Sequence, residues 1–101
     1  MIKEWSEEAE TGFDNLKGKV LVDFFAVWCG PCRTMSRVLE GYAQKNPDLC
    51  IIKVDVDKYP SLASRFDVKS IPTLVFLRDG KMYDRTVGVT SESVLDEKLK
   101  A

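Results

Sequence analysis

The segment 19–27 places the strongest constraint on the fold of this chain. Apolar residues follow one another there without the alternation of a strand that has one face in water: Val20, Leu21, Val22, Phe24, Phe25 and Ala26. Such a run predicts a strand buried on both faces, as in the centre of a sheet covered by helices on both sides. Asp23 interrupts the run, and a buried acid needs either bonding partners or a chemical role.

Helix and strand patterns alternate along the rest of the chain. Apolar spacing and capping residues predict helices after Ser6, over 31–45, from Pro60 and after Ser91. Further strands are predicted over 49–56 and 73–77, and Asp79-Gly80 is a hairpin turn before a strand over 82–87. Parallel strands joined by crossover helices, with an antiparallel hairpin at one edge, make an α/β fold. We expect a mixed sheet of about four to five strands, flanked by about four helices.

Length and charge restrict the function. A chain of 101 residues has the size of one domain, so we expect 1–101 to form a single unit. Fifteen basic against sixteen acidic residues leave a formal charge of -1, which gives no field to attract nucleic acid or an anionic membrane. The longest apolar stretch, 20–28, is shorter than the about 20 residues that cross a bilayer, and the N-terminus lacks an apolar export core. We expect a monomeric cytoplasmic protein.

The cysteines indicate redox chemistry rather than a structural framework. There are three of them and no histidine, which excludes Ser-His-Asp hydrolysis, histidine-activated cysteine nucleophiles and the usual zinc-finger ligand sets. Cys29 and Cys32 alone could be half of a zinc site, but Cys50 supplies only one more thiolate. Cys50 is most simply a small apolar residue at the start of a strand. We expect no metal and no cofactor beyond a redox-active disulfide.

The pair Cys29 and Cys32 lies where the buried strand turns into a helix. Residues three apart on a helical turn are about 5 to 6 Å apart, within the separation that a disulfide requires. Gly30 permits the tight turn, and Pro31 begins the helix where its missing N–H costs nothing. At the helix N-terminus, free N–H groups and the macrodipole lower the pKa of the Cys29 thiol toward neutrality, where thiolate exchange is fastest.

Three segments resemble the thioredoxin family. Val22–Cys32 resembles its active-site strand and turn, Ser70-Ile71-Pro72-Thr73 resembles its cis-proline loop, and Val87-Gly88 resembles its substrate-facing glycine loop. The likeness covers nearly the whole chain in order and spacing. It departs at Arg37, where many members have a helix-kinking proline, and at Phe25, where a second tryptophan is common. The resemblance implies a thioredoxin fold and a protein disulfide reductase, an electron carrier that works by thiol-disulfide exchange.

The resemblance also implies roles for individual residues. Cys29 would attack a target disulfide, Cys32 would resolve the mixed disulfide, and Asp23 would exchange a proton with Cys32 as general acid and base. Lys53 would tune Asp23, and a cis Pro72 would face the sulfurs. The implied apolar docking surface consists of Trp28, Ile71, Pro72, Val87, Gly88 and Val89. The implied partners are disulfide-containing proteins and a thioredoxin reductase that draws on NADPH.

Plainer interpretations stay open beside these roles. Asp23 could be a structural acid bonded to backbone amides, Lys53 a solvated strand end, and Pro72 trans like most prolines. The whole chain could be a thioredoxin-like binding or scaffold subunit whose thiols are incidental. An intact Cys-Gly-Pro-Cys segment behind a buried acid favours the reductase, because a scaffold has no physical need for either.

Overall fold

The computed structural model describes residues 1–6 and 16–100, and these contain a five-stranded sheet. The strand order is β1-β3-β2-β4-β5, so the strand predicted to be buried on both faces lies at the centre. The strands are β1 (Ile2–Glu4), β2 (Lys19–Phe25), β3 (Cys50–Asp55), β4 (Thr73–Arg78) and β5 (Lys81–Val87). The α/β class and the mixed sheet predicted from the sequence are confirmed.

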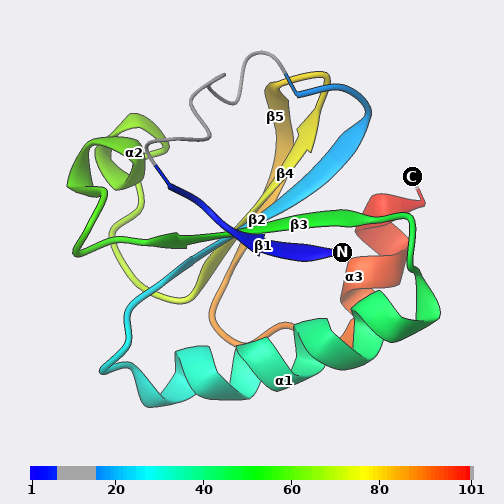
Figure 1. Cartoon of the computed structure of the whole chain (residues 1–101), viewed down its shortest axis with the longest axis horizontal. Helices are drawn as coiled ribbons and strands as arrows, with labels where there is room; N and C mark the ends of the chain where they lie inside the picture. The colour runs from blue at the N-terminus through cyan, green and yellow to red at the C-terminus, as the bar shows by residue number, and fades with distance from the viewer. Residues whose placement is uncertain (7–15, 101) are drawn as a thin grey trace.

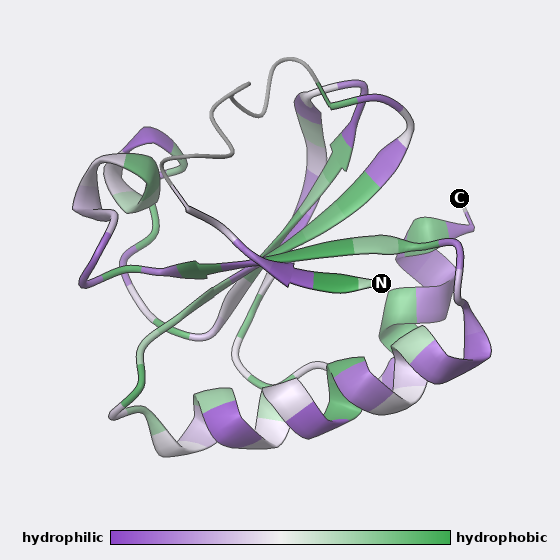
Figure 2. Cartoon of the chain, viewed as in Figure 1, coloured by the Kyte–Doolittle hydropathy of each residue, from purple (hydrophilic) through white to green (hydrophobic). Residues whose placement is uncertain are grey.

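Helices cover both faces of this sheet. They are α1 (Gly30–Lys45), α2 (Pro60–Arg65) and α3 (Glu92–Leu99). Figure 1 shows α1 and α3 along one side of the sheet and α2 on the other. The odd-numbered Leu21 of β2 packs with Met35 and Leu39 of α1, whereas the even-numbered Val22 packs in a second cluster with Ala63 of α2. The two faces of β2 thus belong to two separate apolar cores, and Figure 2 shows its length as largely hydrophobic.

The orientation of β4 differs from the predicted pattern. The sequence led us to expect parallel strands wherever a helix connects them, but β4 runs antiparallel to β2, while β1, β3 and β2 are parallel. Helix length explains the difference. The 16 residues of α1 span about 24 Å, enough to return the chain along a seven-residue strand of about 23 Å, whereas the six residues of α2 span only about 9 Å. The chain therefore enters β4 from the end at which it left β3.

Local signals placed the helix ends and the hairpin correctly. The Ser91 hydroxyl caps α3 by accepting a hydrogen bond from the Val94 N–H, and Pro60 stands at the first position of α2. Asp79 and Gly80 both have positive φ, 51° and 82°, as a two-residue hairpin with the twist of its strands requires. The helix predicted after Ser6 falls mainly on 7–15, outside the described residues.

In the part of the chain that the structure describes, the helices are all too short or too polar to cross a membrane.

Candidate redox site

The two cysteines of the turn between β2 and α1 form a disulfide. Cys29 is the N-cap of α1 in an extended conformation, and Cys32 lies in the first turn, with Pro31 between them. Their Cα atoms are 5.2 Å apart, close to the expected spacing. The Cys29 Sγ accepts a hydrogen bond of 3.1 Å from the backbone N–H of Cys32. One sulfur therefore occupies the place of the capping side chain, where the free N–H groups of the helix gather.

The two sulfurs are buried next to a rim of exposed apolar side chains, formed by Val27, Trp28, Val87 and Val89. Cys29 and Cys32 are only 4% and 2% exposed, but the adjacent Val27 and Trp28 are 71% and 67% exposed. The Cys29 Sγ lies 4.0 Å from the carbonyl oxygen of Ile71. The redox bond is therefore reached at a surface where apolar side chains and a backbone carbonyl meet.

Two loops named in the sequence analysis meet at this rim. The Ile71-Pro72 peptide bond is cis, and the Pro72 carbonyl accepts a hydrogen bond of 2.8 Å from the Gly88 N–H. Val87 and Val89 on either side of Gly88 are 62% and 51% exposed. Pro72 itself is buried and Ile71 half-buried, so most of the apolar surface comes from the two valines and from the residues before Cys29.

Asp23 lies inside the sheet, on the face that α1 covers. It is fully buried, and neither carboxyl oxygen accepts a hydrogen bond from any described residue. Burial raises the pKa of Asp23 to about 6, although the positive charge of Lys53 opposes the rise. A carboxyl group with this pKa can both take and return a proton near neutral pH. The hydrogen bonds of a structural acid are absent here within the described residues.

Lys53 stands opposite Asp23 in the parallel pair of β3 and β2. Its ammonium donates a hydrogen bond of 2.6 Å to the Ser36 hydroxyl of α1 and lies 4.6 Å from the centroid of the Phe25 ring. Lys53 is half-buried in the middle of a strand. A pocket of about 240 Å³ opens here, lined by Phe25, Ala26, Val27, Cys32, Arg33, Ser36 and Lys53. The buried Cys32 thus shares a pocket with Lys53.

Sequence reasoning missed two residues of the site, Asp57 and Ser36. The indole N–H of Trp28 donates a hydrogen bond of 2.8 Å to the Asp57 carboxylate. Asp57 follows the carboxyl end of β3, and that end lies beside the carboxyl end of β2 in the parallel pair. The sequence could have indicated Asp57, because residues that follow neighbouring parallel strands meet at the same edge of the sheet. Ser36 gave no such signal, since a serine in a helix is ordinary.

Among the described residues, Cys50 and the acidic side chains add no second reactive group to the site. The half-buried Cys50 pairs in register with Val20 at the start of β2, so its thiol is remote from Cys29. In the described part of the chain, no group of three or more acidic or cysteine side chains is placed to hold a metal ion.

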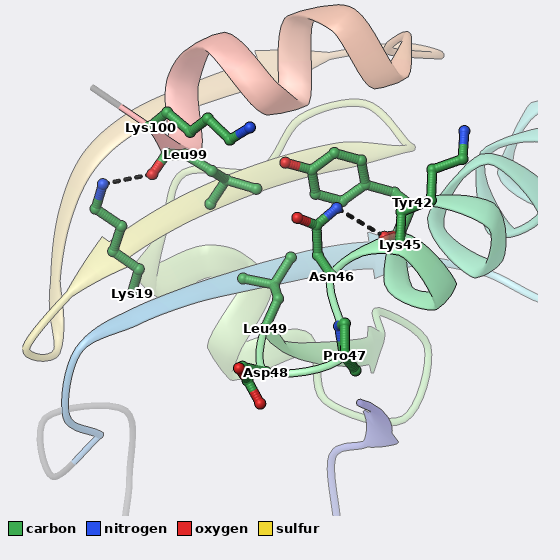
Figure 3. A pocket seen from close by; sticks show the side chains of 9 residues that line it. All are labelled: Lys19, Tyr42, Lys45, Asn46, Pro47, Asp48, Leu49, Leu99 and Lys100. Atoms are coloured by element: carbon green, nitrogen blue, oxygen red, sulfur yellow. Dashed lines mark hydrogen bonds between the residues drawn. The ribbon is translucent and has the colours of Figure 1, made fainter.

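A pocket of about 490 Å³ is also distant from the disulfide. Figure 3 shows it at the end of α1, where Lys19 donates to the Leu99 carbonyl and Asn46 to the Tyr42 carbonyl. Its other lysines, Lys45 and Lys100, form ion pairs with residues of α3. The length of α1, about 24 Å, separates this pocket from Cys29, so it takes no part in the redox site.

Comparison with known proteins agrees with this geometry. The family model described as Thioredoxin matches residues 3–101. A thioredoxin of Mycoplasmoides gallisepticum is 44% identical over 82 residues, which are 81% of this chain and 82% of that protein. Thioredoxin H-type 1 of Nicotiana tabacum is 41% identical over 99 residues, which are 98% of this chain and 78% of that protein. The oxidised form of mitochondrial thioredoxin 3 from Saccharomyces cerevisiae has a TM-score of 0.85 at 31% identity, covering 98% of this chain and 93% of that one.

Proposed function

Because this chain belongs to the thioredoxin family, we propose that it reduces disulfide bonds in other proteins with Cys29 as the attacking thiolate. The family and the Cys29–Cys32 disulfide make it a thiol-disulfide oxidoreductase. The observation that carries the proposal is the position of this disulfide at the N-terminus of α1. A thiolate at Cys29 gains the Cys32 N–H hydrogen bond and the helix dipole.

The reaction has two exchange steps. In the first, the Cys29 thiolate attacks one sulfur of the substrate disulfide, forming a mixed disulfide and releasing the other substrate sulfur as a thiolate. In the second, Cys32 loses its proton and attacks the Cys29 Sγ, which forms the intramolecular disulfide and releases the remaining substrate sulfur. Two electrons have then moved from the protein dithiol to the substrate, and the Cys29–Cys32 couple is the only redox group required.

Asp23 is proposed as the group that takes the proton from Cys32, directly or through one water. It is buried on the face of the sheet that α1 covers, and its pKa of about 6 suits proton transfer near neutral pH. Lys53 is proposed to tune this acid, because its charge is the one that opposes the rise in pKa. The proton then passes to solvent or to the departing substrate thiolate.

The substrate is proposed to dock as an extended segment across the rim. Trp28, Val87 and Val89 supply exposed apolar surface. The Ile71 carbonyl, 4.0 Å from the Cys29 Sγ, is placed to accept a backbone hydrogen bond from a segment that lies over the sulfur. Main-chain bonding together with apolar contact suits many sequences, as a general reductase requires.

The oxidised protein needs two electrons to return to the dithiol. The family implies disulfide-containing substrates and a reductase partner, and we propose an NADPH-dependent flavoprotein thioredoxin reductase. We also propose the cytoplasm as the compartment, because the dithiol form persists where thiols are kept reduced. Sedimentation at a mass near 11.4 kDa and recovery in the cytosolic fraction would support a cytoplasmic monomer, and a dimer or recovery elsewhere would oppose it.

Insulin reduction tests the proposed function. The dithiol protein should accelerate the precipitation of reduced insulin chains, and Cys29→Ser should abolish the acceleration. Cys50→Ser is the matched control and should keep the full rate, because Cys50 is remote from the disulfide. Cys32→Ser should accumulate a mixed disulfide that is visible by mass spectrometry. Equal, slow reduction by the wild type and Cys29→Ser would favour a scaffold role instead.

A further inference from the structure

Two opposite charges face each other inside the sheet without bonding. Asp23 and Lys53 are partners in the register of β2 and β3, and a buried carboxylate beside an ammonium ordinarily forms an ion pair. Neither Asp23 oxygen accepts a hydrogen bond from a described residue. The Lys53 ammonium donates instead to the Ser36 hydroxyl, at 2.6 Å.

Ser36 is placed to compete with the carboxyl group for this ammonium. It lies one helical turn after Cys32 on α1, so both side chains are on the same side of the helix. Ser36, Lys53 and Cys32 line the same pocket of about 240 Å³. The Phe25 ring, 4.6 Å from the ammonium, favours the same position through a cation–π contact. The hydroxyl and the ring together hold the charge toward α1.

We propose that Ser36 is a positioning residue for the exchange reaction: its hydroxyl holds the Lys53 ammonium away from the Asp23 carboxyl, which leaves that carboxyl unbonded and ready to exchange a proton. The inference rests on the proposed function, in which Asp23 serves Cys32. A carboxylate that accepts a bond from an ammonium is stabilised in its charged form. With the ammonium bonded to Ser36 instead, burial outweighs the Lys53 charge and raises the pKa of Asp23.

The other groups near Asp23 do not replace Lys53 in this role. Among the α1 residues that line the pocket with Lys53, the ionisable ones are Cys32, which is tied in the disulfide, and Arg33, which donates to the Val27 carbonyl. The register partner of Asp23 on β4 is the apolar Leu74. Removing the Ser36 hydroxyl therefore changes the position of one charge, that of Lys53.

Ser36→Ala tests the proposal by titration of the Asp23 carboxyl carbon, followed by NMR in the oxidised protein, where Cys29 and Cys32 do not titrate. The freed ammonium should turn to Asp23 and lower the pKa of that carboxyl by about one. Ser36→Thr keeps a hydroxyl and should titrate like the wild type. Thr34→Ala removes an exposed hydroxyl from the same helix and should also leave the titration unchanged.

A double variant shows whether Ser36 acts through Lys53. In the Lys53→Met background, Ser36→Ala should cause no further change in the Asp23 titration, because no ammonium is left to move. An unchanged or raised pKa in Ser36→Ala, or the same fall without Lys53, overturns the proposal. The titration measures the pKa of Asp23 without any reaction, so its result does not depend on the insulin assay. A wild-type protein that failed to reduce insulin would refute the proposed function. The titration would still show whether Ser36 controls the contact between Lys53 and Asp23.

Discussion

Asp23 and Asp55 are both buried on the adjacent strands β2 and β3, yet of these two acids only Asp55 accepts hydrogen bonds, from the backbone N–H groups of Asp57 and Lys58. The bonds to the Asp55 oxygens offset the cost of burying that carboxyl group, whereas burial without such bonds raises the pKa of Asp23. The contrast separates an acid that supports the fold from one whose burial costs stability.

Asp23→Asn should stabilise the protein above pH 6. The pKa of Asp23 is about 6 in the folded state, whereas its ordinary value, which applies to the unfolded chain, is 3.8. Between these pH values the folded state therefore holds a proton that the unfolded state has lost. The free energy of unfolding therefore falls as pH rises from about 4 to about 6 and stays lower above it. The variant avoids this loss, which is about 3 kcal/mol at pH 8 and near zero at pH 3.5.

Urea unfolding at the two pH values measures the effect. Asp55→Asn is the control, and it should give no stabilisation at either pH because it weakens a bonded carboxylate. If Asp23→Asn were no more stable than the wild type at pH 8, the raised pKa of Asp23 would be refuted.

Ser91→Ala should lower the free energy of unfolding by about 1 kcal/mol, because it removes the N-cap of α3. Ser93→Ala, on the same helix and exposed, is the matched variant and should change stability by less than about 0.5 kcal/mol. Thermal unfolding of the three proteins checks the difference. Equal melting temperatures for the two variants would contradict the cap.

Gly41→Ala should stabilise the protein by up to about 1 kcal/mol, because glycine inside a helix is costly. The added Cβ would lie 3.1 Å from the Glu92 Oε2, the far end of a flexible side chain that can shift while its Oε1 stays near Lys45. Chemical unfolding measures the gain. A loss of stability would mean that the Glu92 side chain cannot shift by the few tenths of an ångström required.

Asp57→Ala should slow insulin reduction by about threefold to tenfold, because the Trp28 indole beside Cys29 would no longer be held by its hydrogen bond. The free energy of unfolding should change by less than about 1 kcal/mol, since the bond is exposed to solvent. Asp57→Asn keeps an acceptor and should retain most of the rate. A full rate in Asp57→Ala would show that the hydrogen bond does not matter for exchange.

Much of the fold followed from short-range signals. The run over 19–27 predicted the central strand, Pro31 and Pro60 marked helix starts, Ser91 marked a cap, and Asp79-Gly80 marked the hairpin. The orientation of β4 did not follow, because it depends on whether the connection is long enough to return along a strand. The spacing of apolar residues predicts that α2 is a helix, but it does not predict the direction in which the chain leaves that helix to enter β4.

The redox pair was determined by the sequence alone, since two cysteines on one helical turn at a helix N-terminus are brought together by local geometry. The burial of Asp23 was also readable, because it lies within an apolar run. Only the tertiary structure decided which groups surround that acid. The contacts of Lys53 with Ser36 and of Trp28 with Asp57 join segments 17 and 29 residues apart, and such contacts depend on strand order and helix placement that no local pattern specifies.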